Sequence, residues 1–205
     1  RGRVVAIGYQ ALENQDAAAH TYNVAIGYRA GRDIVGGIQN TLIGGQSGES
    51  LTSGGGNVVI GYNALSIEDA TGRVVAIGYG ALASQDTPAN SYNVAIGYNA
   101  STLSTTGAEN TIVGSFAGDA ILGASNSVLM GVHAGGALTS GSANVAIGHS
   151  ALRNETGYGS NVAIGEQALT AQNAGATAYN VAVGYQAGIA VLTAIRSTLV
   201  GSQAG

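Results

Sequence analysis

The chain repeats one short pattern twelve times: a β-branched residue, two aliphatic residues and a glycine, as in Val24-Ala25-Ile26-Gly27. A repeat of this length and regularity is typical of a solenoid in which each repeat forms one coil. We therefore expect an all-β fold, a parallel β-solenoid of 12 coils of 17 or 19 residues that forms a single repeat domain over residues 1–205. The repeated glycine is termed the anchor glycine, and it stands at Gly8, Gly27, Gly44, Gly61, Gly78, Gly97, Gly114, Gly131, Gly148, Gly165, Gly184 and Gly201.

The composition excludes several classes of protein. With 34 glycines, one Phe and no Trp among 205 residues, the chain has too few bulky side chains for a thick globular core. Its net charge of −4 comes with seven arginines and no lysine, so we expect no basic stripe and no nucleic-acid partner. No apolar run is long enough for a membrane span, and we expect no membrane insertion by this segment.

Side chains alternate between the two faces of a strand, so the residues three before and one before each anchor glycine share a face. We assign these two columns, which hold Val or Thr and Ile, Val or Met, to the interior of the coil. The middle column then points outward, and an apolar outward row marks an interface. We expect it to be the seam of a parallel homotrimer, formed by Ala6, Ala25, Leu42, Val59, Ala76, Ala95, Ile112, Leu129, Ala146, Ala163, Ala182 and Leu199.

Two exchanges of side-chain volume accompany this pattern. Where the middle column holds Leu or Ile, the residue after the anchor glycine is small or shortened, and otherwise it is usually Tyr, which predicts one crowded space at the seam. Four residues after the anchor the chain has Leu or Gly, and each Gly is followed by an aliphatic residue three positions later, as in Gly31 and Ile34. We expect one large aliphatic per coil to close the core, with Ser101 and Leu103 in this role after Gly97.

The motif Asn-Val-Ala-Ile-Gly-Tyr-x-Ala-Leu resembles the head repeats of trimeric autotransporter adhesins, and similar repeats of trimeric tail-fibre-like adhesive proteins of phages and bacteria. The resemblance covers the whole chain. It implies a left-handed β-roll, three chains side by side, and a location that is extracellular, on a cell surface or in a virion tail fibre. Since the chain starts and stops within a repeat, we expect a segment of a longer fibre, whose partners are its own copies and a cell-surface glycan or receptor.

Several residues are candidates for binding. Tyrosines in the expected edge loops are candidates for contacting glycans, because a tyrosine combines an apolar ring with a hydroxyl; they are Tyr22, Tyr92, Tyr158 and Tyr179. The tyrosines that follow the anchor glycines are expected to pack at or beside the subunit interface. The column of Asn residues before the motif predicts stacked amide ladders or turn caps rather than an ion site. His149 and Glu166 share a column and are expected to form a simple pair rather than a metal site.

No catalytic, cofactor-binding or metal-binding residue is assigned, because the sequence lacks a paired-carboxylate cluster in a long loop and a calcium-binding glycine repeat. We expect a structural and adhesive fibre segment that is not an enzyme. Two alternatives remain. The stretch from Ile7 to Leu12 resembles one hexapeptide of the left-handed β-helix acyltransferases, and an ice-binding solenoid would use a threonine column, of which the chain has only Thr41, Thr111 and Thr198.

Overall fold

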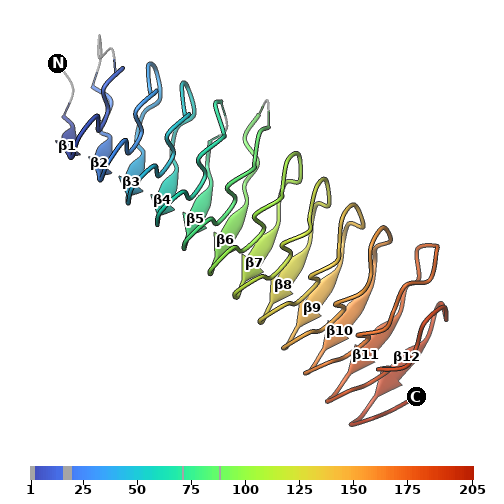
Figure 1. The fold of residues 1–205 in the computed structure, drawn as a ribbon. Helices are drawn as coiled ribbons and strands as arrows, with labels where there is room; N and C mark the ends of the chain where they lie inside the picture. Colours follow the sequence, from blue (N-terminus) through green and yellow to red (C-terminus); the bar gives the residue numbers. More distant parts are fainter. Residues whose placement is uncertain (1–2, 16–19, 71, 88) are drawn as a thin grey trace.

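The computed structural model of the chain describes residues 3–15, 20–70, 72–87 and 89–205. It shows a stack of coils, each of which contributes one three-residue strand to a single parallel sheet that runs from β1 to β12 in chain order (Figure 1). The expected all-β parallel solenoid is thereby confirmed, and the described residues contain no helix that would cross a membrane. The strands are β1 Val5–Ile7, β2 Val24–Ile26, β3 Thr41–Ile43, β4 Val58–Ile60, β5 Val75–Ile77, β6 Val94–Ile96, β7 Thr111–Val113, β8 Val128–Met130, β9 Val145–Ile147, β10 Val162–Ile164, β11 Val181–Val183 and β12 Thr198–Val200.

The repeat motifs stack in register, so that each residue lies beside its equivalent in the next coil. Val145 pairs with Val162, for example, and Ile147 pairs with Ile164. Backbone hydrogen bonds between coils continue past the strands into the turns, as where the Leu152 N–H donates to the Ala168 carbonyl over 2.9 Å. The backbone ladder therefore holds neighbouring coils together on more than one side, which keeps the stack straight along its length (Figure 1).

The anchor glycines lie where each strand ends and the chain turns. Their φ angles range from +128° at Gly201 to +144° at Gly97, a region that side chains rarely adopt. A Cβ atom at Gly148 would also lie 2.5 Å from the carbonyl carbon of Gly165 in the next coil. Glycine is therefore required here for two reasons, the backbone conformation and the close approach of the next coil.

The middle residue of each strand points into the coil, not outward, which corrects the expected orientation of the sheet. From β2 to β11 this column has no solvent exposure, whereas the residues on either side of it are half-buried or exposed. Ala6 and Leu199 belong to the same column but keep some exposure because they lie in the terminal coils. The inward residues, which cannot be the seam, are Ala25, Leu42, Val59, Ala76, Ala95, Ile112, Leu129, Ala146, Ala163 and Ala182.

The volume exchange that the sequence displays takes place inside the coil. A Cβ atom at Gly135 would lie 2.9 Å from Leu129 Cδ2, whereas the coil with the small Ala146 places Leu152 at the equivalent position. The inner column thus exchanges volume with the residue four after the anchor glycine in the same coil or in the preceding one, as where a Cβ atom at Gly31 would lie 2.5 Å from Leu42 Cδ1. The expected exchange with the tyrosine column is wrong, because those rings are about half exposed on the outer surface: Tyr62, for example, is 50% exposed.

The expected closure of the core by one aliphatic residue per coil is confirmed in most coils. Ile34 and Leu65 are both fully buried, although they come from the two alternative positions. A Cβ atom at Gly31 would lie 3.0 Å from Ile34 Cδ1, so the glycine makes room for the later side chain. The coil after Gly97 differs, because Leu103 is 50% exposed and the buried positions hold Ser101 and Ser104 instead.

Candidate interaction surfaces

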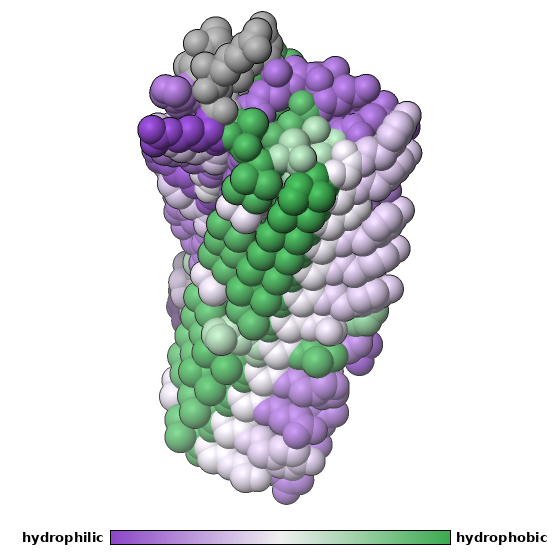
Figure 2. Space-filling model, turned by 90° about the vertical axis from the view of Figure 1, so that its left-hand side faces the viewer, coloured by the Kyte–Doolittle hydropathy of each residue, from purple (hydrophilic) through white to green (hydrophobic). Residues whose placement is uncertain are grey.

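The outer face of the sheet is a continuous apolar band that runs the length of the molecule (Figure 2). It consists of the two residues that flank the middle of each strand, and these columns contain only Val, Ile, Thr and Met. Exposure in this band ranges from half-buried positions such as Val162 through 40% at Met130 to 70% at Val200 in the terminal coil. A β-sheet with such side chains on both faces is normally covered on both faces, so this band is the main candidate interface.

A ladder of aromatic rings follows the edge of this band. Neighbouring ring centroids lie 5.2 to 5.5 Å apart, and the sequence of rings is Tyr62, Tyr79, Tyr98, Phe116 and His133. Most of the pairs are stacked, so that each ring covers a face of its neighbour. A sugar that stacks on an aromatic side chain needs a free ring face, and inside the ladder such a face is already occupied. Ring faces without a stacked partner therefore lie at the ends of the ladder and at the Tyr98–Phe116 junction, where the rings meet edge to face.

The four tyrosines proposed for glycan contact do not form one site. Tyr22 and Tyr92 stand in equivalent positions four coils apart, which corresponds to about 19 Å at the usual strand spacing. Each has an arginine of the preceding coil at its ring, and the Arg73 guanidinium also donates a 2.6 Å hydrogen bond to the Tyr92 hydroxyl. Tyr179 is 56% exposed and Tyr158 is half-buried. Glycan contacts at Tyr22 and at Tyr92 would therefore be made at separate sites.

The asparagine column forms a buried ladder, in agreement with its expected structural role. The Asn40 N–H donates to Asn23 Oδ1 over 2.8 Å, and Asn40 Nδ2 donates to the Gly54 carbonyl over 2.9 Å. The next coil repeats this arrangement with Asn57, whose N–H donates to Asn40 Oδ1. These side chains satisfy backbone groups that the turn would otherwise leave unpaired inside the coil.

A second group of polar side chains lies inside the later coils. Glu155 is fully buried, and its Oε1 accepts hydrogen bonds from the Thr156 and Tyr158 N–H groups. Burial raises the pKa of the Glu155 carboxyl, while those backbone N–H groups act in the opposite direction. Within the described residues Glu155 Oε2 has no hydrogen-bond partner. The buried Asn161 Nδ2 and Gln172 Nε2 atoms of the following coil also have none. Unpartnered polar atoms thus occur in these later coils both at Glu155 and Gln172 and, at Asn161, within the asparagine ladder itself.

Two further groups of ionisable residues form no functional site. His149 and Glu166 are both exposed, and their side chains make no ion pair in the described part of the chain, so the expected pair is not present. Elsewhere, carboxylate oxygens of Glu68, Asp69 and Asp86 all lie within 4.8 Å of one another. Glu68 uses its oxygens to accept hydrogen bonds from backbone N–H groups, and the two aspartates are exposed. We assign no cation to this cluster.

A different column, five residues after the anchor glycine, carries most of the ion pairs. In the early coils Arg32 contacts Glu49 of the next coil and also Asp33, the latter over 2.5 Å. Gln46 Nε2 donates to Glu49 Oε2 over 2.8 Å. The hydrogen bond from Arg32 lowers the pKa of Asp33, against the opposing effect of burial. Opposite charges in neighbouring coils thus neutralise each other directly.

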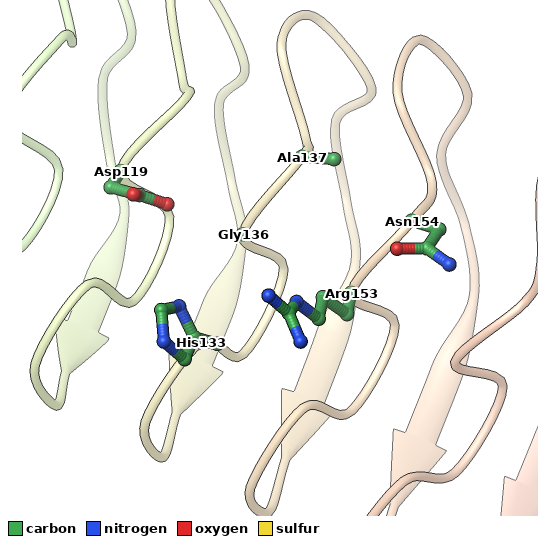
Figure 3. Close-up of a pocket in the computed structure, with 6 residues that line it drawn as sticks. All are labelled: Asp119, His133, Gly136, Ala137, Arg153 and Asn154. Atoms are coloured by element: carbon green, nitrogen blue, oxygen red, sulfur yellow. The ribbon is translucent and has the colours of Figure 1, made fainter.

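In the later coils the same column contains a gap. Its successive residues are Asp119, Gly136 and Arg153, and the glycine leaves a cavity of about 330 Å³ that is also lined by His133, Ala137 and Asn154. Figure 3 shows the Asp119 carboxylate and the Arg153 guanidinium pointing into the space from opposite sides of Gly136, with His133 between them. Neither charge takes part in an ion pair within the described residues. Dehydration raises the pKa of Asp119, although the nearby His133 and Arg153 favour its ionised form.

Sequence analysis did not find this pocket. One signal was available, because Gly136 is the only glycine in a column that otherwise holds charged, polar or larger residues. Comparisons with protein-family models, with curated proteins and with solved structures gave no match to this chain. The candidate surfaces are therefore the outer apolar band and the Asp119–Arg153 pocket, both defined by the geometry of the coils.

Proposed function

We propose that this chain is a segment of an extracellular homotrimeric fibre, the shaft or head of a cell-surface or virion tail fibre that serves attachment to a host or another cell. The observation that carries the proposal is the apolar outer band, which gives every coil from β1 to β12 a water-exposed apolar strip. Long exposed apolar surfaces of this kind mark sites of association. The seam of the proposed assembly is this band and not the middle column.

Copies of the same chain are the best occupants of the band. Its residues repeat in every coil with the same spacing, so parallel copies placed side by side align the same side chains at each level. No charged residue interrupts the two outer columns, which suits a dry interface. A threefold arrangement of left-handed coils is what the resemblance of the repeat implies. With about 4.8 Å between neighbouring strands, the twelve coils form a rod of about 50 Å that holds other parts of a fibre away from a surface.

The proposal is tested by the mass of the purified segment in solution. Three times the chain mass of 20.1 kDa, about 60 kDa, is expected from light scattering at micromolar concentration. The double variant Ile147→Lys and Ile164→Lys places charges in the band and should lower the mass to that of one chain. Thr177→Lys adds a lysine at an exposed loop position and should leave the mass unchanged. A monomeric wild-type segment, or a double variant with undiminished mass, would contradict the proposal.

A further inference from the structure

The pocket between Asp119 and Arg153 has the features of a binding site on the side of the rod. In the same column Arg32 and Glu49, which belong to neighbouring coils, form an ion pair. Asp119 and Arg153 lie two coils apart, about 9 to 10 Å by strand spacing, with Gly136 between them. Within the described residues no ion pair joins them. Two opposite charges are thus held at the ends of one cavity of about 330 Å³, a size at the lower end of small-molecule pockets.

The absence of a side chain at Gly136 is what keeps this space open. A Cβ atom there would lie 3.5 Å from Asp119 Oδ1 and 3.8 Å from Arg153 Cγ, so any longer side chain would enter the cavity. The column accepts longer residues in other coils, including Thr102 and Thr170. Unlike the anchor glycines, Gly136 does not have a φ angle in the left-handed region. The backbone conformation therefore does not require glycine at this position.

The aromatic ladder ends at the same pocket. His133 stacks on Phe116 with an interplanar angle of 10° and a centroid distance of 5.2 Å, which fixes the plane of its ring. The next residue in its column is the small Ser150, and within the described residues Phe116 is the aromatic partner that His133 has. The second face of the imidazole therefore lacks the aromatic cover that the rings inside the ladder have. This is the ladder's free face beside charged and hydrogen-bonding groups.

We propose that this pocket binds a sugar that carries a carboxylate, such as a hexuronic acid unit of a surface polysaccharide. The Arg153 guanidinium offers a planar fork that matches the two oxygens of a carboxylate. Asp119, which when ionised only accepts hydrogen bonds, accepts them from sugar hydroxyl groups at the opposite end, and the Asn154 amide both donates and accepts. The ring of the sugar lies over Gly136 against the free face of His133. This inference rests on the proposed attachment function and gives that function a ligand class.

The chemistry of the pocket favours an acidic sugar over the other small ligands. A neutral sugar leaves the guanidinium without an anionic partner, and a simple carboxylate such as acetate leaves Asp119 and His133 unused. A zwitterion such as glycine satisfies both charges but has no ring to place against the His133 imidazole. Of these ligands, only the acidic sugar offers a carboxylate to the Arg153 guanidinium, hydroxyl groups to the Asp119 carboxylate and a ring to the space between them.

The test is a titration of the whole segment with D-glucuronate, with D-glucose, acetate and glycine as comparison probes. Binding is followed by the NMR signals of the His133 imidazole, while His20 and His149, which lie outside the pocket, serve as internal references. We expect glucuronate to shift the His133 signals with an affinity at least tenfold above that of the other probes. Equal affinity for glucose, acetate or glycine, or shifts at His20 and His149 alone, would overturn the proposal.

Variants locate the binding. Gly136→Thr fills the cavity and should abolish the shift, and Arg153→Gln should weaken binding about tenfold or more, the usual effect of losing a hydrogen bond to a charged group. Arg196→Gln removes an exposed arginine elsewhere and should change nothing. Circular dichroism checks that each variant is folded, and Arg153→Gln alters only an exposed side chain. Unchanged binding in Arg153→Gln would refute the assignment. All pocket residues come from one chain, so a monomeric segment would refute the fibre without affecting this result.

Discussion

The two faces of the sheet use similar residues for different purposes. The inner face carries the middle residue of each strand, which varies from Ala to Leu, and each Leu or Ile there is matched by a glycine four residues after the anchor glycine of the same coil. The outer face carries only Val, Ile, Thr and Met, whose sizes vary less than those of the inner column. Variation with compensation indicates a core that one chain fills by itself. Uniformity indicates a surface that must fit another molecule.

The largest loss of stability is expected when a charge is placed on the inner face of a strand, and it is best compared with a variant that has the same charge on the outer face. Ala163→Glu puts a carboxylate in a position with no exposure and should cost at least about 4 kcal/mol, enough to prevent cooperative folding. Val162→Glu puts the same side chain on the outer band and should leave the coil folded while the assembly dissociates. Circular dichroism and light scattering distinguish the outcomes. Equal loss of β-sheet signal in both variants would break the comparison of the two faces.

A smaller but still severe loss is expected where the strand meets the turn. Gly148→Ala forces a side chain into a φ of +132° and within 2.5 Å of the Gly165 carbonyl group, so both backbones must move. We expect a loss of about 3 kcal/mol or more in the free energy of unfolding, measured by urea denaturation. Gly136→Ala is the matched control, because that glycine lacks a left-handed φ and its nearest contact, the His133 carbonyl oxygen, is 3.3 Å away; it should change stability little. Similar losses in both variants would show that stacking does not require the anchor.

A gain in stability is expected at the one coil whose core is closed by serines. Ser101 has a φ of +52°, the same conformation that Leu82 adopts at the equivalent position of the preceding coil, and its hydroxyl is buried without a partner. Ser101→Leu should therefore stabilise the chain by about 1–2 kcal/mol, through buried apolar surface and the loss of the unpaired hydroxyl. Ser101→Ala should give a smaller gain. Thermal unfolding that shows a loss for the Leu variant would mean that this coil has no room to fill.

The smallest effect concerns the pH dependence of stability inside the coil. Because burial raises the pKa of Glu155 above its ordinary value of 4.5, its stabilising contribution is full at low pH and is lost as pH rises through the raised pKa. Glu155→Gln, which introduces the residue found at the equivalent Gln85 and Gln172, should flatten this decline above pH 4.5. Asp119, whose pKa is also raised, leaves a residual slope. The pH dependence is measured from the midpoints of urea denaturation at a series of pH values. An unchanged slope in Glu155→Gln would contradict the raised pKa of Glu155.

The repeat pattern predicted most features that depend on local geometry. The spacing of the anchor glycines predicted one coil per repeat, and the alternation of Leu12 with Gly31 and Ile34 predicted how the core is closed in most coils, the coil after Gly97 excepted. The asparagine column was correctly interpreted as a ladder. These predictions succeeded because a solenoid stacks its repeats, so that residues at equivalent positions of successive repeats lie beside one another in the structure.

The sequence alone determined a stack of twelve coils with one short strand in each. It did not determine which face of each strand is inside. The alternation of side chains shows which residues share a face, but both faces of these strands are apolar, so hydrophobicity does not distinguish the inner face from the outer one. Only the tertiary structure decided this. It buries Ala146 together with Leu152 inside the coil and leaves Val145 and Ile147 half-buried on the outer face. The pocket has the same origin. Asp119, Gly136 and Arg153 lie 17 residues apart in sequence, and only the direction of their side chains makes one cavity of them.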